Sequence, residues 1–240
     1  MSDIVDINTL FGPAPIAASD LSVDDLSALM ARHSVGACCT LSTLGILLDP
    51  GAGNTATRAA AAENPRLVPV ATYNPLTCHG HDGAQIHPRA DGFRMVRFFP
   101  ALQGWPPRFA PLLAILRRLE PEGIPVMIDI DQPGEATELV AALGPDHVPV
   151  VLAGIGERTL SEAIALLQVH DGLYIETSRL LMMGGAALAV ERAGADRVLF
   201  GSGAPMRPMA AALASLRLAE ISEQDRALVM GGNARRLLNL

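Results

Sequence analysis

The chain has 240 residues, of which 50% are hydrophobic and 18% are charged, a composition typical of one globular domain and not of a disordered, collagenous or coiled-coil protein. Its formal net charge is −7, and all 18 basic residues are arginines because the sequence contains no lysine. The acidic balance argues against nucleic acid as a partner. The missing ε-amine excludes Schiff-base chemistry, a P-loop lysine and a carbamylated-lysine metal bridge.

The cysteines and the apolar runs indicate where the protein works. Cys38, Cys39 and Cys78 are too few for a disulfide framework, which favours a reducing compartment. No apolar run reaches the roughly 18 to 20 residues that cross a bilayer. We therefore expect a cytoplasmic protein with no membrane partner.

Short runs rich in Val, Ile and Leu alternate with longer segments of helical periodicity, a pattern typical of β/α units around a buried parallel sheet. The predicted strands are Asp3–Asn8, Val35–Leu41, Leu67–Tyr73, Phe93–Phe99, Ile124–Ile130, Val148–Gly154, Leu173–Ser178 and Arg197–Ser202. The clearest predicted helices are Ser22–His33, which opens with a capping box, Arg108–Glu120, Gly134–Leu143, Leu160–Val169 and Leu180–Ala193. Eight strands in a chain of about 250 residues predict an α/β protein, a (β/α)8 TIM barrel, with residues 1–240 as its single domain. A doubly wound open sheet is the alternative.

The end of the chain carries two motifs that resemble a known family. They are the turn Gly201-Ser202-Gly203-Ala204-Pro205 and the segment GGNARRLL at 231–238. Barrels of the amidohydrolase-related family end in a G-S-D-x-P turn and a G-G-N-A-x-R-L-L helix. The segments NPRLVPVATYNP, GFRMVRFFP, GIPVMIDI and LYIETS are similar to the third, fourth, fifth and seventh strands of that family. The resemblance implies a metal-dependent hydrolase.

The same resemblance implies positions for metal ligands, and other residues stand there. The H-x-H pair on the first strand corresponds to Asn8 and Leu10, and the ligands after the fifth, sixth and eighth strands correspond to Asp129, Gly154 and Gly203. One carboxylate and one amide cannot supply the three or four donors that a zinc ion requires. We therefore expect no metal and no cofactor at the mouth of the barrel.

The histidines offer no replacement ligands for this site. Three of them precede strands or close a helix at the far end of the predicted barrel: His33, His147 and His170. The others lie with Cys78 in the loop between the third and fourth strands, on the side of the site: His79, His81 and His87. This loop lacks the second half of a zinc-binding spacing, so a solvated polar loop is the favoured interpretation.

Polar residues near the carboxyl ends of the strands are the candidates for function, because barrel enzymes carry their active sites there. Asp129, Arg97 and Glu176 are the candidate catalytic residues, and Arg97 inside FRMVRFF must find a partner or reach solvent. The candidate ligand-binding residues are Asn8, Trp105, Ser178 and Ser202. An arginine beside Asp129 would favour a structural ion pair over a general base.

Three functions remain open on these observations. The first is a metal-free barrel, catalytically impaired or non-catalytic, that serves as a partner or regulatory subunit. The second is a metal-independent hydrolase, lyase or isomerase, in which Arg97 anchors a small anionic carbonyl compound and Asp129 moves a proton. The third is a small-molecule binding module. The apolar segments Leu180–Met183 and Met206–Met209 are core or interface, so we expect a homo-oligomer or a hetero-oligomer with a related barrel.

Overall fold

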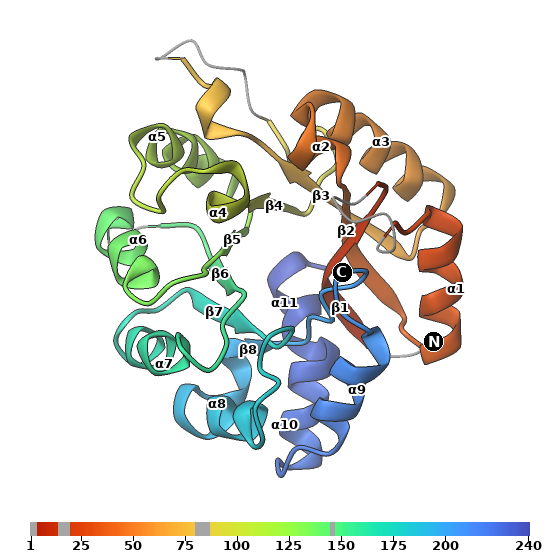
Figure 1. Ribbon diagram of the computed structural model, residues 1–240, viewed down its shortest axis with the longest axis vertical. Helices are drawn as coiled ribbons and strands as arrows, with labels where there is room; N and C mark the ends of the chain where they lie inside the picture. The colour runs from red at the N-terminus through yellow and green to blue at the C-terminus, as the bar shows by residue number, and fades with distance from the viewer. Residues whose placement is uncertain (1–3, 14–19, 80–86, 145–146) are drawn as a thin grey trace.

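The computed structural model describes residues 4–13, 20–79, 87–144 and 147–240. In this part of the chain eight parallel strands follow one another in sequence order around the centre of the molecule, with helices outside them (Figure 1). The strands are β1 Val5–Phe11, β2 Ala37–Ser42, β3 Leu67–Thr72, β4 Met95–Phe98, β5 Val126–Asp129, β6 Val150–Ala153, β7 Leu173–Glu176 and β8 Val198–Leu199. The predicted (β/α)8 barrel is confirmed, and the open sheet is excluded.

Backbone hydrogen bonds between the first and last strands close the barrel. The N–H of Ile7 donates to the carbonyl of Phe200 at 2.9 Å, and the N–H of Leu10 donates to the carbonyl of Ala204 at 2.8 Å. A closed barrel leaves no unpaired sheet edge exposed to other chains. We call the junction of β1 and β8 the seam.

The alternation of side chains along the strands divides the core into two layers. Met95 packs inside the barrel, whereas Val96 packs between the strands and the helices. Cys38 and Cys39 divide in the same way, and both are buried. Arg97 stands two residues beyond Met95, so the same alternation directs its side chain into the barrel interior.

The helices follow the predicted order with shifts at their ends. They are α1 Val23–His33, α2 Leu44–Leu47, α3 Pro50–Glu63, α4 Pro100–Gln103, α5 Ala110–Leu119, α6 Glu135–Leu143, α7 Leu160–Val169, α8 Gly185–Ala193, α9 Met209–Arg217, α10 Glu223–Ala227 and α11 Asn233–Leu238. The predicted cap of α1 is present, because the Ser22 hydroxyl accepts from the N–H of Asp25 at 3.0 Å. Helix α8 begins later than predicted, after Gly184, whose φ of 72° ends the preceding turn.

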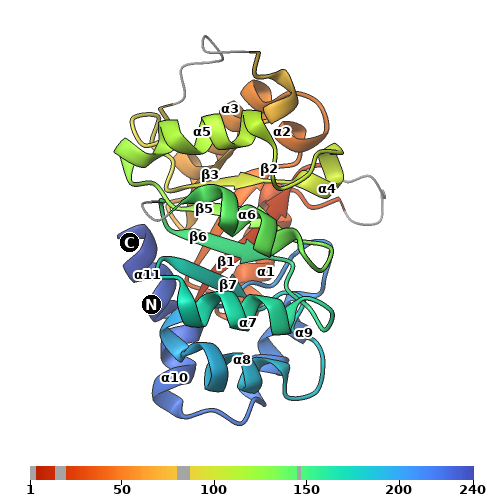
Figure 2. The ribbon, with the colours of Figure 1, turned by 90° about the vertical axis from the view of Figure 1, so that its left-hand side faces the viewer.

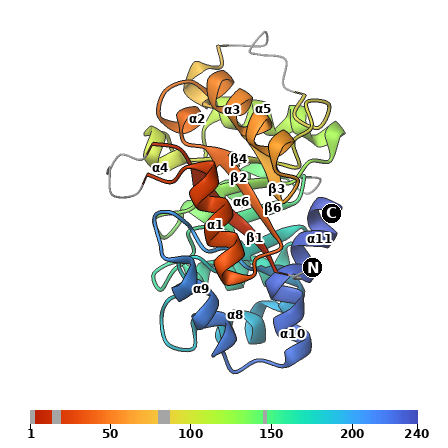
Figure 3. The same ribbon diagram turned by 90° about the vertical axis from the view of Figure 1, so that its right-hand side faces the viewer.

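Two side views from opposite directions, each at 90° to Figure 1, separate the two ends of the barrel. Helix α4 follows the carboxyl end of β4 and lies at one end of the molecule, while α11 lies at the opposite end (Figures 2 and 3). The α4 end is therefore the end where the strands finish and where barrel sites form. In the described ranges, no helix combines the length and the apolar character needed to cross a bilayer.

Candidate functional site

A cavity of about 250 Å³ opens at the carboxyl ends of the strands. All five residues that the family resemblance places at metal-ligand positions line it: Asn8, Leu10, Asp129, Gly154 and Gly203. Two of these residues lie on β1 and the other three at the ends of β5, β6 and β8, yet they face one common space. The cavity is therefore the place where the resemblance expects the active site.

The guanidinium of Arg97 lies at the bottom of this cavity and binds the two polar residues of that set. Its Nε and Nη2 donate to Oδ1 of Asp129 at 3.0 and 2.9 Å, and Nη2 also donates to Oδ2 at 3.2 Å. Its Nη1 donates to Oδ1 of Asn8 at 2.6 Å. The guanidinium carbon also lies 4.6 Å from the centre of the Phe99 ring, within the range of a cation–π contact. The Arg97 side chain is 7% exposed and that of Asp129 is 33% exposed.

These contacts bear on whether the residues at the mouth could coordinate the metal ion that the resemblance implies. Leu10, Gly154 and Gly203 bring no side-chain donor, and the oxygens of Asn8 and Asp129 already accept hydrogen bonds from a permanent cation. Among the residues that the structure describes, no three His, Cys, Asp or Glu side chains are grouped so that they could hold a metal ion. Within this set of five residues, only Asn8 and Asp129 carry side-chain oxygens that could bind a divalent metal.

Glu176 lies beneath the cavity and organises the opposite wall. It is fully buried, and its Oε1 accepts from the N–H of Gly154 at 3.0 Å and from the Ser178 hydroxyl at 2.8 Å. Its Oε2 accepts from the N–H of Ser178 at 2.7 Å. The amide nitrogen of Asn8 reaches the Ser178 oxygen at 3.4 Å. Hydrogen bonds thus connect Glu176 through Ser178 and Asn8 to Arg97 across the barrel.

A second buried carboxyl group, Asp6, lies at the seam. Its Oδ1 accepts from the N–H groups of Asn8 and Ser202 at 3.0 and 2.9 Å, while Oδ2 has no partner among the described residues. Burial raises the pKa of Asp6 to about 7, against the opposing effect of the hydrogen bonds from Ser202 and Asn8. Sequence reasoning missed Asp6, although an acidic residue inside an apolar strand is a signal that it needs a partner.

The structure brings most of the predicted site residues together and leaves one outside. Asn8, Arg97, Asp129 and Ser178 line the cavity, Glu176 is buried against the lining residues Gly154 and Ser178, and Ser202 is buried at the seam against Asp6. The predicted ligand-binding residue Trp105 is the exception. Its ring stacks on Phe109 at 6.1 Å, its Nε1 donates to Gln103 at 3.1 Å, and it packs in the layer between strands and helices. That packing holds the Trp105 side chain away from the cavity lining.

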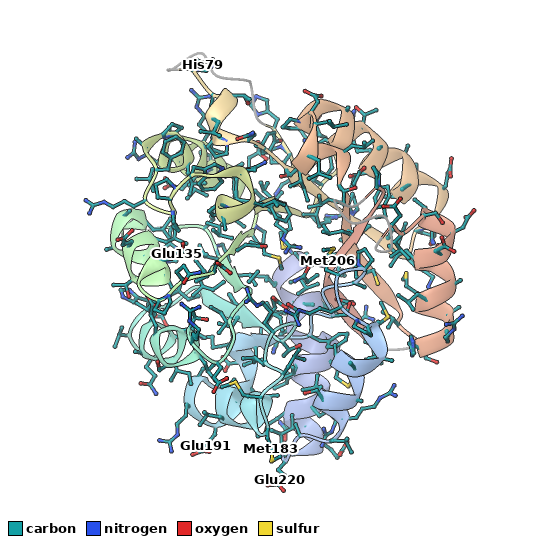
Figure 4. The ribbon with its side chains drawn as sticks, in the orientation of Figure 1. His79, Glu135, Met183, Glu191, Met206 and Glu220 are labelled. Atoms are coloured by element: carbon teal, nitrogen blue, oxygen red, sulfur yellow. The ribbon has the colours of Figure 1, made fainter. Side chains whose placement is uncertain are left out.

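The two described histidines of the loop after β3, His79 and His87, do not line the cavity. His87 Nδ1 lies 3.3 Å from Oε1 of Glu122, and Glu122 precedes β5, at the end opposite the cavity. The expectation that His87 lies on the side of the site is therefore corrected. His79 lies at the edge of the molecule, far from the cavity residue Met206 (Figure 4). His81 falls outside the described residues.

The outer rim of the cavity is rich in arginine. Arg179 binds Asp131 at 3.2 Å, with both side chains more than 40% exposed. Arg207 lines the same cavity and forms no ion pair within the described ranges. Counting Arg97 and Asp129, the lining holds three arginines and two aspartates. The mouth is thus locally cationic in a chain whose net charge is −7.

A (β/α)8 barrel with a cavity at the carboxyl ends of its strands defines a TIM-barrel protein, and such proteins form their ligand sites at that face. The family comparison is more specific. A family model described as amidohydrolase matches residues 49–240. The chain belongs to the amidohydrolase family.

Several solved structures are similar to this chain over its length. A 2,6-dihydroxybenzoate decarboxylase, solved with 2,6-dihydroxybenzoate, is 16% identical with a TM-score of 0.78, and the match covers 100% of both chains. An uncharacterized TIM-barrel protein from Bordetella bronchiseptica is 21% identical with a TM-score of 0.75 over 98% of each chain. The 5-carboxyvanillate decarboxylase of Sphingomonas paucimobilis is 17% identical with a TM-score of 0.72 over 99% of each chain. No curated protein matches the sequence. At these identities the structural similarity establishes the fold.

Proposed function

We propose that this member of the amidohydrolase family works without a metal ion and binds a small anionic molecule in the cavity without breaking a bond in it. The observation that carries the proposal is the set of hydrogen bonds from Arg97 to Asn8 and Asp129. A divalent ion at these oxygens would have to displace a buried guanidinium from its hydrogen bonds or sit beside it against like-charge repulsion.

Two features of the lining support an anionic ligand. Arg207 faces the cavity without an ion pair to any described residue. The hydrogen bonds of Arg97 leave one of its five N–H groups, on Nη1, without a hydrogen-bond partner among the described residues. Arginine N–H groups suit carboxylate and phosphate oxygens. A cavity of about 250 Å³ limits the ligand to a small molecule.

The binding role is favoured over catalysis by how the acidic groups are held. Both oxygens of Asp129 accept from Arg97, and the oxygens of Glu176 accept from Ser178 and Gly154. The metal-independent hydrolase, lyase or isomerase is the second candidate. One observation supports it, namely the 33% exposure of the Asp129 carboxylate to the cavity.

Metal analysis and ligand screening together test the proposal. The protein is expressed with Zn²⁺ and Mn²⁺ in the medium, purified without chelators, and its metal content is measured by mass spectrometry. We expect substoichiometric metal, and a rise of the melting temperature with one of a panel of small carboxylates without product formation. A stoichiometric transition metal would overturn the proposal. Turnover that persists in a chelator and disappears in Asp129→Asn would replace binding by the second candidate.

A regulatory role beside a related barrel is a further form of the same proposal. Leu102, Leu181 and Met206 are more than half exposed and line the two adjoining hollows at the mouth, where a partner would cover them. Light scattering and co-purification test this form, and a strictly monomeric protein recovered alone contradicts it. We place the function in the cytoplasm, which the three free cysteines support.

A further inference from the structure

We infer that the barrel mouth contains a binding site for a guanidinium cation, which the Arg97 side chain of this chain fills from within. The site is made by the Asp129 carboxylate, the Asn8 amide oxygen and the face of the Phe99 ring. This inference rests on the proposed metal-independent function, and it identifies the cation bound at the mouth as a guanidinium.

The three recognition elements match a planar cation and not a spherical one. The carboxylate of Asp129 receives two nitrogens of one guanidinium edge, at 3.0 and 2.9 Å, which is the fork geometry of arginine–carboxylate pairs. Phe99 covers a face of the same plane, with the central carbon 4.6 Å from the ring centre. Divalent ions require four to eight donors at about 2.0 to 2.6 Å, and an aromatic face supplies none.

The site is also held in place by contacts that do not involve Arg97. The amide nitrogen of Asn8 reaches Ser178 at 3.4 Å, which directs the amide oxygen toward the guanidinium. Ser178 is in turn fixed by two hydrogen bonds to the buried Glu176. Asp129 ends β5, which pairs with β4 and β6 on either side. The Asn8 amide and the backbone of Asp129 are therefore held by contacts other than the Arg97 side chain, so we expect the site to persist when only that side chain is shortened.

Chemical rescue tests the site directly. Arg97→Ala removes the guanidinium and leaves its space empty, so we expect a lower melting temperature than that of the wild type. Millimolar methylguanidinium should raise the melting temperature of Arg97→Ala by several degrees and leave the wild type unchanged. Methylammonium carries the same charge without the planar fork, so it serves as the matched cation and should rescue less than methylguanidinium does.

A double variant and a control variant at an arginine outside the cavity test whether methylguanidinium acts at this site. Arg97→Ala with Asp129→Asn lacks the carboxylate and should not respond to methylguanidinium. Arg94→Ala removes an exposed arginine near the start of the same strand and should behave as the wild type. Equal responses of the single and double variants, or no response of Arg97→Ala, would overturn the inference.

A second pair of variants covers the case in which Arg97→Ala does not fold. Arg97→Lys keeps a cation near Asp129, and Arg97→Met keeps comparable bulk without charge. The inference expects the Lys variant to melt at the higher temperature, and equal melting temperatures would contradict it. Failure here is distinguishable from failure of the proposed function. Absent rescue in a metal-poor wild type refutes the guanidinium site alone, whereas stoichiometric metal in the wild type refutes the proposed function.

Discussion

The two sides of the barrel mouth hold their carboxyl groups by different means. On the β4–β5 side, Asp129 is bound by the guanidinium of Arg97 at 2.9 Å and stays in contact with the cavity. On the side of β7 and the seam, Glu176 and Asp6 are fully buried and accept hydrogen bonds from backbone N–H and serine groups. In the described chain neither of these two forms an ion pair. The β4–β5 side pairs its carboxylate with a guanidinium, whereas the side of β7 and the seam binds its carboxyl groups through N–H and hydroxyl groups.

The difference in partners bears on the pKa of the buried carboxyl group at the seam, Asp6. A guanidinium stays charged throughout the accessible pH range, so a carboxylate beside it keeps a constant partner. For a fully buried carboxyl group that has only N–H and hydroxyl partners, these hydrogen bonds offset only part of the cost of ionisation. The raised pKa of Asp6, about 7, is the consequence of burial at the seam.

The largest expected effect concerns Asp6. Between about pH 4 and pH 7 the folded protein keeps a proton on Asp6 that the unfolded chain has lost, because the pKa rises from 3.8 to about 7. The free energy of unfolding should therefore fall with rising pH by about 4 kcal/mol from this group. Asp6→Asn removes that dependence. Urea unfolding of the variant and the wild type across this range measures it, with the exposed Asp24→Asn as the control, and parallel profiles would contradict the prediction.

The next effect is steric and belongs to Glu176. A Cβ at position 201 would lie 2.2 Å from Oε2 of Glu176 and 3.0 Å from Cβ of Asn8, so only glycine fits there. Gly201→Ala should lower the free energy of unfolding by about 3 kcal/mol, because Glu176 has no room to move. Gly156→Ala is the matched control, since its nearest neighbouring atom would be 3.4 Å away. Equal denaturation midpoints for the two variants would show that Glu176 gives way.

A smaller loss is expected on the charged side. Asp129→Asn keeps one oxygen acceptor for Arg97 but removes the negative charge, and the site is partly open to water. We expect a loss of about 2 kcal/mol, measured by urea unfolding. In a double-mutant cycle with Arg97→Met the two changes should be strongly non-additive. If the losses in free energy of unfolding from Asp129→Asn and Arg97→Met were additive, the Arg97–Asp129 ion pair would not stabilise the β4–β5 side.

Local patterns in the sequence predicted the barrel, and partly its site. A charged residue inside FRMVRFF indicated that Arg97 needs a partner or solvent, and the periodicity of Leu160–Val169 predicted α7 with its observed bounds. Arg97 and Asp129 stand on neighbouring parallel strands, so their contact follows once the barrel order is assumed. The contacts of Asp6 with Ser202 and of Arg97 with Asn8 join residues 196 and 89 positions apart. They depend on how the barrel closes, which no local pattern contains.

Trp105 illustrates the opposite error. A single tryptophan in a loop after a strand suggested a ligand contact, but the large apolar ring gains more from the layer under the helices, where Phe109 stacks on it. Trp105 is buried, as a large apolar ring favours, but it packs in the layer under the helices and does not line the cavity. The choice between the cavity and the outer layer depends on the path of the chain after α4, which composition does not fix.

The smallest effect concerns the exposed pair at the rim and tests whether burial is what makes the inner pair matter. Hydrogen bonds from Gln132 and Arg179 lower the pKa of Asp131, so its contribution to stability is present near neutral pH and is lost as the pH falls through that lowered value. Because both side chains of the Arg179–Asp131 pair are more than 40% exposed, water and salt screen the attraction, and Asp131→Asn should change the free energy of unfolding by less than about 0.5 kcal/mol. Measured beside Asp129→Asn in low and high salt, the rim variant should approach the wild type as salt rises while the inner variant keeps its deficit. Equal losses at the two aspartates would mean that proximity to arginine, and not enclosure by Asn8, Phe99 and the barrel wall, sets the strength of these pairs.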